Sequence, residues 1–595
     1  MNRCMAALMA TAVLCIAAPA TAQDACIDFL ENHAQDEAWQ KACIDFLEGL
    51  PKGSTLAAGS QSQQMMGMGP TGLFAETPTN VSVKAPSVLG EPLSQQELMI
   101  ATDPPLGRLF VVTQVETDDH LFAAYSDNLG GSWTSRKIAL QNDPSGPLPD
   151  GGGDPWTVFD SFGNLWLSYL GKGGPNQPTY VAKSVDPAPP PPGPWVPFIA
   201  ADVYTANAPF TDKPVLATGP DTTMRAAQAA ASLWVFYVDI ASPRSIVAQG
   251  AALNADGDII MNFCGNDPAT PGDDAFCPRQ VIVSDIPEGE PGGPKKFFTG
   301  DIEIGPSGQV LVTYFTVVQN AALLPTEIFV KIDVDGLGSG DFVDASPADP
   351  DADFETYLLF RSVIPATAPQ ATQSFPYLSW DRDTTRYPSA SDGRVHLVFI
   401  DADPDDGDDT DVLATYSDDL GATWHRPCPG ASYDCPSWAT DPFPIRVSDD
   451  VGDRSQFHPY ADVDQTTGNL GVVWRDARDD PGNADAHIFA SIRLAGADGF
   501  LPNIQVTEGT AKPLTEENAY YEYLGMEFEN GLIDATWVDN SNFYLDSWEA
   551  AQDPPLPPGM DPFHAVLPEP GVGIQMLAGV TALIGLAHLR SSRAG

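Results

Sequence analysis

Basic residues are scarce in this sequence. The chain of 595 residues holds 29 Lys and Arg against 80 Asp and Glu, which gives a formal net charge of −51 at pH 7. Binding to a phosphate backbone or to anionic lipid depends on Lys and Arg, so this imbalance argues against nucleic acid as a partner. An acidic surface is better suited to cations, or to solubility in a salty medium.

Apolar runs of the kind used for targeting occur at the two ends of the chain. At the start, Arg3 precedes an apolar stretch from Met5 to about Ala18, and the small residues 20–22 resemble a cleavage site. This pattern predicts an export signal over residues 1–22, with a membrane anchor as the alternative.

The C-terminal run is preceded by a short motif and followed by basic residues. Pro568, Glu569 and Pro570 come before a mainly apolar segment, residues 571–589, and then Arg590. Nineteen residues at about 1.5 Å each reach roughly 28 Å, enough to cross the hydrocarbon core as a transmembrane helix. The tail resembles the PEP-CTERM sorting signal. That resemblance implies processing by an exosortase and a location in the envelope, on the surface or outside a Gram-negative bacterium. A permanent anchor is the alternative.

Cysteine is rare, and its spacing does not favour zinc. No two cysteines are separated by two residues, and the eight histidines are dispersed. Six of the eight cysteines lie beyond the export signal. In an exported chain, close pairs predict local disulfides, with zinc as the alternative. The predicted pairs are Cys26–Cys43, Cys264–Cys277 and Cys428–Cys435.

The segment before the main body contains a duplication. The string ACIDFLE occurs at residues 25–31 and again at 42–48, which predicts a small helical hairpin over residues 23–52. We interpret it as a cap or spacer, with a helical adaptor as the alternative. By composition, residues 53–79 form a flexible linker and 551–567 a Pro-rich linker around a folded body at 80–550.

One pattern recurs through this body and predicts an all-β fold. A small residue is followed by an aliphatic residue at +2 and most often an aromatic one at +6, in seven copies that start 56 to 85 residues apart. The copies start at Gly107, Gly163, Ala231, Gly308, Gly393, Gly468 and Gly531. Even offsets place these side chains on one face of a strand. With a strand before each copy and two after it, each unit is a four-stranded antiparallel meander, and the repeat predicts a seven-bladed β-propeller. Six blades are the alternative.

Two octets follow the third strand of their units. SDDLGATW begins at Ser417 and SDNLGGSW at Ser126. The acceptor side chain, the glycine and the tryptophan of each octet suit a hairpin turn packed onto its blade. The expected structural residues are Ser126, Asn128, Gly130, Trp133, Ser417, Asp419, Gly421 and Trp424. With the sevenfold pattern, these octets resemble the Asp-box (BNR repeat) propellers of the sialidase-like superfamily.

Catalytic members of that superfamily are expected to carry a Tyr nucleophile with a Glu, an Asp acid/base, three arginines and an Arg-Ile-Pro element. This sequence contains no Arg-Ile-Pro. The remaining candidates are Tyr521 with Glu522, and Arg475 with Arg478 at a strand end. Activity is therefore left open. We expect a non-catalytic carbohydrate- or protein-binding module, with an exo-α-sialidase-like glycoside hydrolase as the alternative and a purely structural role as a third.

An acidic loop at residues 401–411 carries seven aspartates. Alternating aspartates present hard oxygen ligands, so Asp401, Asp403, Asp405 and Asp408 are candidates for a Ca²⁺ site, with a solvated acidic turn as the alternative. Position twelve is Val412, which argues against an EF-hand. No other cofactor is expected.

Overall fold

The computed structural model describes residues 81–568 with gaps. The gaps are 83–94, 116–119, 141–145, 173–176, 186–194, 207–209, 222–228, 242, 266–274, 288–294, 317–325, 346–357, 363–375, 403–409, 426–444, 451, 453, 484, 508–523 and 540–560. The chain divides into two compact units, residues 68–569 and residues 1–67 with 570–595, and all described residues lie in the first. The expected export signal, helical hairpin, flexible linker and C-terminal apolar segment lie outside the described residues. No helix within the described ranges is both long and apolar enough to cross a membrane.

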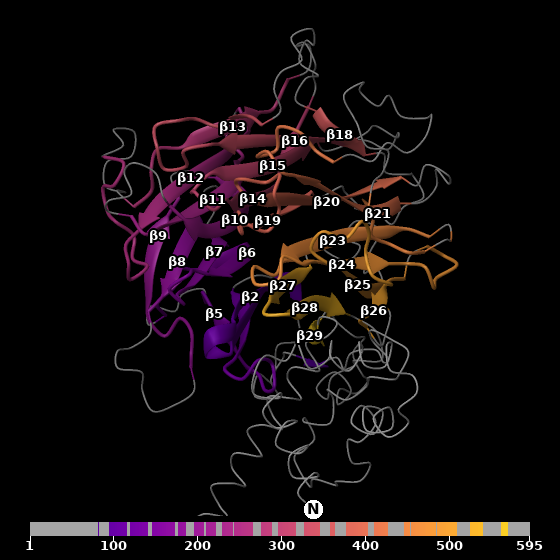
Figure 1. Ribbon diagram of the computed structural model, residues 1–595. Coiled ribbons are helices and arrows are strands. Elements are labelled where there is room, and N and C mark those ends of the chain that lie inside the picture. The colour runs from indigo at the N-terminus through magenta and orange to yellow at the C-terminus, as the bar shows by residue number, and fades with distance from the viewer. Residues whose placement is uncertain are drawn as a thin grey trace, which may run out of the picture. The chain divides into compact units, whose positions relative to one another are not determined.

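The described residues form seven antiparallel sheets, each with a path of four strands (Figure 1). Blades 1 to 3 are β2 (Gln95–Asp103), β3 (Arg108–Val115), β4 (Leu121–Ser126) and β5 (Thr134–Ile138); β6 (Gly151–Phe159), β7 (Leu165–Gly171), β8 (Thr179–Ser184) and β9 (Ala201–Thr205); and β10 (Thr211–Pro220), β11 (Ala231–Asp239), β12 (Ser245–Leu253) and β13 (Gln280–Ser284). A short 3₁₀ helix, η1 (Pro104–Leu106), joins β2 to β3.

Blades 4 to 7 continue in the same order. They are β14 (Phe297–Ile304), β15 (Val310–Thr316), β16 (Thr326–Asp333) and β17 (Val343–Asp344); β19 (Tyr377–Asp381), β20 (Arg394–Ala402), β21 (Thr410–Ser417) and β22 (Ile445–Arg446); β23 (Gln456–Val463), β24 (Leu470–Asp476), β25 (His487–Arg493) and β26 (Ile504–Gln505); and β27 (Gly525–Glu529), β28 (Leu532–Asp539), β29 (Asp561–Pro568) and β1 (Val81–Ser82). In blade 4, β18 (Leu358–Ser362) also pairs with β16. The predicted seven-bladed propeller of four-stranded blades is confirmed.

The last blade is completed by the start of the body. Val81 pairs with His564, so β1 is the outermost strand of a sheet whose other strands come from the C-terminal end. In Figure 1 the colours run around the ring, and indigo β2 lies beside yellow β27 and β28. The Pro-rich linker expected at 551–567 is wrong in its last part, because residues 561–568 form β29. Its apolar residues pair along β28, although prolines flank them.

The recurring glycines and aromatics have clear structural roles. Each of the six glycine-led copies begins its second strand with a positive φ, for example 81° at Gly163 and 75° at Gly468. A residue with a Cβ is strained there. The aromatic residues at +6 are at most 3% exposed where the pattern holds, and they form the cores between blades. These residues are Tyr169, Tyr237, Tyr314, Phe399, Trp474 and Trp537.

The first strands of the seven blades surround the central axis. Each contacts the first strand of the next blade, and β27 contacts β2, so the ring is closed. In five of these strands the register with the second strand shifts by a bulge, as between Gln96 and Met99 or between Phe457 and Tyr460. Bulges turn side chains toward new directions and often occur next to functional sites.

Candidate functional site

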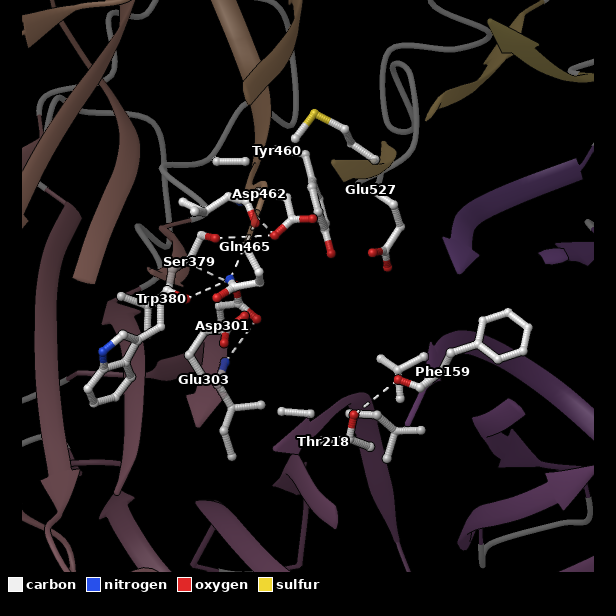
Figure 2. Close-up of a pocket in the computed structure, with 18 of the residues that line it drawn as sticks. Phe159, Thr218, Asp301, Glu303, Ser379, Trp380, Tyr460, Asp462, Gln465 and Glu527 are labelled. Carbon is white, nitrogen blue, oxygen red and sulfur yellow. Dashed lines mark hydrogen bonds between the residues drawn. The ribbon is translucent and has the colours of Figure 1, made fainter. Parts of the chain in front are cut away.

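The clearest candidate site is a cavity of about 170 Å³ on the axis of the ring (Figure 2). Residues from the first strands of all seven blades line it, including Thr102 of β2 and Glu527 of β27. Most of these residues belong to the second half of their strands, such as Glu303 on β14 and Asp462 on β23. The cavity therefore lies toward the carboxyl ends of the inner strands.

Acidic side chains dominate this cavity. Five carboxyl groups line it, those of Asp301, Glu303, Asp462, Glu527 and Glu529. Among the described residues, the lining includes a single cationic side chain, Arg382. Even inside a protein of net charge −51, five carboxyl groups around one small space repel one another strongly.

Two of the five carboxylates join neighbouring blades. Asp301 accepts hydrogen bonds from the amide of Leu378 in the next blade at 3.0 Å and from an amide of its own strand at 2.9 Å. Asp462 repeats this arrangement, with the amide of Phe528 at 2.8 Å and an amide of its own strand at 2.7 Å. Ser379 also donates to Asp462, at 3.2 Å. These two carboxylates connect inner strands, so part of the acidic character is structural.

The guanidinium and the backbone amide of Arg382 donate hydrogen bonds to groups of the protein itself. Its Nε donates to the carbonyl of Ile304 at 2.7 Å, and its guanidinium also reaches the carbonyl of Thr218 at 3.4 Å and Glu303 at 3.3 Å. Its backbone amide donates to Gln465 at 3.1 Å. The guanidinium therefore bridges three blades and neutralises one carboxylate of the cavity.

The environment of the cavity raises the pKa of all five of its carboxyl groups. Burial raises the pKa of Glu303 and of Glu529 to about 7, and nearby Asp462 adds to both shifts. Burial raises the pKa of Asp462 to about 6. Burial and then the charges of Asp462, Glu529 and Glu303 raise the pKa of Glu527 well above its ordinary value. Glu303, Glu527 and Glu529 therefore favour their protonated forms up to about neutral pH.

Tyr460 lies beside Glu527 in the cavity (Figure 2). Burial, followed by the charges of Asp301 and Glu527, raises the pKa of the Tyr460 phenol well above its ordinary value. A Tyr and a Glu side by side are the parts of an activated phenol nucleophile. Here Glu527 tends to keep its own proton, so it is a poor base for the phenol.

A second set of acids lies at the opposite ends of the inner strands. Glu97 accepts from the amide of Asp154 in the next blade at 3.2 Å, and Asp154 accepts from the amide of Lys213 in the blade after it at 2.8 Å. Burial and the charge of Glu97 raise the pKa of Asp154 well above its ordinary value. The same type of inter-blade carboxylate bond therefore recurs around the ring.

The two octets form turns between the third and fourth strands of their blades. Ser417 Oγ accepts from the amide of Gly421 at 2.8 Å, and Asp419 accepts from the amide and hydroxyl of Thr423 at 2.7 and 2.6 Å. Trp424 is 6% exposed and donates to the Gly421 carbonyl at 2.9 Å. Every one of these bonds is local to the turn.

The other octet uses an amide where the first uses a carboxylate. Asn128 accepts from the amide of Ser132 at 2.9 Å, and Ser126 Oγ accepts from the amide of Gly130 at 2.9 Å. Trp133 packs edge-on against His564 of the last blade, with ring centroids 5.2 Å apart. No residue of either octet lines the axial cavity.

A third turn of this kind went unrecognised in the sequence. At the end of β16, Asp333 accepts from the amide of Asp335 at 3.1 Å, and Asp335 accepts from the amides of Ser339 and Gly340 at 3.0 Å each. Phe342, which is 9% exposed, follows this turn two residues later than the tryptophan follows in the octets. The signal was present in VDGLGSGDF, but the serine and the tryptophan of the pattern are both replaced.

The arginine candidates from the sequence lie away from the cavity. Arg475 is fully buried on β24, and its guanidinium reaches the carbonyl of Val538 in the next blade at 3.5 Å. Arg478 donates to Asp476 at 2.7 Å and to Asp449 at 2.8 Å. Neither arginine lines the axial cavity. Tyr521 and Glu522 lie outside the described residues.

The structure describes only part of the acidic loop and of the cysteine pairs. Asp401 is buried at the end of β20, whereas Asp403, Asp405 and Asp408 lie outside the described residues. A disulfide joins Cys264 to Cys277, whose Cα atoms are 5.2 Å apart. The other cysteine pairs lie outside the described residues. Within the described ranges, no group of three or more His, Cys, Asp or Glu is arranged to hold a metal ion.

Sequence reasoning missed the carboxylates of the axial cavity, although a signal for them exists. Strands that precede a recurring glycine carry acids two residues apart: Asp301 with Glu303, and Glu527 with Glu529. Side chains two apart share one face of a strand, and here that face points to the axis. The strand pattern identified which residues share a face, but it did not show which face meets the other blades.

No protein-family profile matches the sequence, and no curated protein sequence matches it. Among solved structures, an ulvan lyase described as a polysaccharide lyase is similar, with 12% identity and a TM-score of 0.41, over 77% of this chain and 93% of the other. The Hadza microbial sialidase matches with 12% identity and a TM-score of 0.35, over 82% and 68% of the two chains. An α-L-arabinanase of Penicillium chrysogenum matches with 14% identity and a TM-score of 0.32, over 71% and 99%. Similarity at this level assigns no activity to this chain.

Proposed function

We propose that this protein is an exported, surface-associated β-propeller that binds a polysaccharide at its axial cavity without cleaving it. The observation that carries the proposal is the state of Arg382, the single arginine in the described lining of the cavity. Its guanidinium donates to Glu303 and to two carbonyl groups, so it does not offer a free pair of N–H donors to a substrate carboxylate. A sialidase-type site uses several arginines to bind the substrate carboxylate in this way.

The acidic side chains of the cavity also favour binding over cleavage. Asp301 and Asp462 accept hydrogen bonds from backbone amides of the next blade, which fixes them as connectors. Glu527 tends to stay protonated because burial and its neighbours raise its pKa. Partly exposed Val158, Phe159 and Tyr460 add apolar and aromatic surface on which a sugar ring can pack.

A glycoside hydrolase on the same scaffold is the second candidate, and one observation favours it. Glu303 and Asp462 face one cavity with pKa values raised to about 7 and about 6. Glycoside cleavage by acid and base catalysis uses two carboxyl groups at one site, one protonated and one ionised.

Turnover and binding, measured on the same purified full chain, decide between the two. We expect no release of product from a fluorogenic sialoside, from neutral aryl glycosides or from a uronate polymer. We also expect retarded migration in affinity gels that contain a neutral or amine-bearing polysaccharide. Turnover that Glu303→Gln or Asp462→Asn abolishes would establish a hydrolase at the cavity. Turnover lost in Tyr521→Phe or Glu522→Gln would place a catalytic site at these two residues. A protein retarded by no polysaccharide would refute the binding function.

Export and surface association rest on the two ends of the sequence. A signal at residues 1–22 and the sorting motif at 568–570 support passage out of the cytoplasm and processing by an exosortase. Mass spectrometry of the protein recovered from its native cells checks this part. We expect an N-terminus near Gln23 and a C-terminus near Pro570, whereas intact ends would contradict it.

A further inference from the structure

The axial cavity is lined by five carboxyl groups but, among the described residues, by a single cationic side chain. Arg382 compensates Glu303, while Glu527 accepts no hydrogen bond from any described residue. Glu527 and Glu529 are both partly exposed, so solvent and a ligand can reach them. The charge and access of this side of the cavity suit a cation.

A buried hydroxyl on the neighbouring strand marks the same side of the cavity. Thr102 lines the cavity and is 7% exposed, and its Oγ1 has no hydrogen-bond partner in the described part of the chain. A buried polar atom without a partner costs free energy unless a ligand or water satisfies it. Thr102 and Glu527 belong to adjacent inner strands, because Gly525 packs against the amide of Ile100, and each lies two residues further along its strand. Three oxygen-bearing side chains of the adjacent strands β2 and β27 therefore line the cavity.

We propose that the axial cavity binds the protonated primary amine of an amino sugar, with Glu527, Glu529 and the Thr102 hydroxyl as its acceptors. An ammonium group has three donors and no acceptor, so it needs three oxygen acceptors around one point. This inference rests on the proposed polysaccharide binding and narrows it to polymers with free amino groups. The cavity bears no free guanidinium for an acidic sugar, and the crowded carboxylates repel one.

A primary amine fits this lining better than a bare metal ion. Among the described residues, no three acidic or His/Cys side chains are close enough to coordinate a metal. An ammonium group accepts longer contacts, of about 2.8 Å to each oxygen, and does not demand a tight coordination shell. Phe159 and Tyr460, partly exposed in the same lining, provide faces for the sugar ring that carries the amine.

Binding of a cation is expected to release protons from the cavity. The titratable and charged groups of its lining on other elements are Asp301, Glu303, Asp462, Tyr460 and Arg382, and outside the lining Asp464 acts on Glu529 and Asp534 acts on Glu527. In the empty cavity the pKa of Glu303 and of Glu529 is raised to about 7, so these groups hold protons in weak acid. An ammonium group favours their ionised forms, so its affinity should rise from pH 5.5 toward neutral pH and fall again at higher pH, where the sugar amine loses its own proton.

Calorimetry with matched oligosaccharides tests the proposal. The probes are a glucosamine tetramer and an N-acetylglucosamine tetramer, which differ in whether the nitrogen carries a charge. We expect the wild-type chain to bind the glucosamine tetramer at least tenfold more tightly at pH 6.5, where the amine still carries its proton. Glu527→Gln should remove most of that preference. Asp498→Asn, which removes an exposed charge on an outer turn, should leave it unchanged. Circular dichroism and thermal melting confirm that each variant is folded.

The possible outcomes separate this inference from the proposed function. Equal affinity for both tetramers would overturn the amine site and leave polysaccharide binding intact. A preference that Asp498→Asn weakens as much as Glu527→Gln would show attraction by the acidic exterior and overturn the site. Displacement of the tetramer by millimolar Ca²⁺, with a matching loss in Glu527→Gln, would assign the cavity to a divalent cation instead. Binding of neither tetramer would also overturn the inference. The affinity gels would then show whether the protein binds polysaccharide at all.

Discussion

The Asp-box turns and the axial cavity hold their polar side chains in opposite ways. In the turn at Ser417, the acceptor Asp419 bonds to Thr423, four residues away, and all bonds close within one octet. In the cavity, Asp462 bonds to Phe528, 66 residues away, and Glu527 is surrounded by other acids. In the turn, the acceptor side chain bonds within its own octet. In the cavity, several carboxyl groups lie close together, and Glu527 accepts no hydrogen bond from a described residue. Ligand binding belongs to the second kind of environment.

The turn contributes to stability rather than to ligand binding, and its tryptophan should show the largest effect. Trp424 is 6% exposed and caps the octet. Trp424→Ala should lower the free energy of unfolding by about 3 kcal/mol, because truncating a buried aromatic loses packing and leaves a cavity. Chemical denaturation measures this change. The affinity of the folded protein for polysaccharide should not change, and a tenfold loss would make the turn part of the binding site.

The cavity should show the reverse behaviour, in which removal of a charged group stabilises the fold. Burial and neighbouring carboxylates raise the pKa of Glu529 from 4.5 to about 7 on folding. A carboxyl group with a raised folded-state pKa contributes most stability below pH 4.5, and that contribution is lost as the pH rises to 7. Glu529→Gln should therefore stabilise the protein by about 2 kcal/mol at pH 8, after allowance for solvent access, and by almost nothing at pH 4.

Unfolding curves at the two pH values provide the test, with Asp498→Asn as the matched control. Both variants remove one negative charge, but Asp498 is exposed on an outer turn. An equal gain in both would mean that the net charge of the chain, rather than crowding at the axis, sets the effect. A destabilised Glu529→Gln at pH 8 would show that the carboxylate is satisfied and that the cavity is not strained by charge.

The contrast also explains which features could be predicted from the sequence. The sevenfold repeat predicted the blades because Gly163 and Tyr169 act within one hairpin and one strand. The octets predicted their turns for the same reason. The cavity depends on seven strands that start tens of residues apart, and nothing local to Glu303 or Glu527 indicates that they face each other. β29 was missed because prolines obscured its pairing. Arg475 was a candidate because of its place at a strand end, and a strand end alone does not show that the side chain is fully buried.

The smallest expected effect compares the two octets directly. Asp419 uses one carboxylate oxygen for the Thr423 amide and the other for the Thr423 hydroxyl, at 2.7 and 2.6 Å. Asn128 meets the same demands in the other octet, where its oxygen accepts the Ser132 amide and its nitrogen donates to the Ser132 hydroxyl at 3.0 Å. Asp419→Asn should therefore cost less than about 0.5 kcal/mol, whereas Asp419→Ala should cost about 1 kcal/mol, because it removes every acceptor. Chemical denaturation of both variants checks this order. If Asp419→Asn cost as much as Asp419→Ala, the negative charge of Asp419 would contribute to stability. The turn would then depend on charge, as the cavity does, and not on its local hydrogen bonds alone.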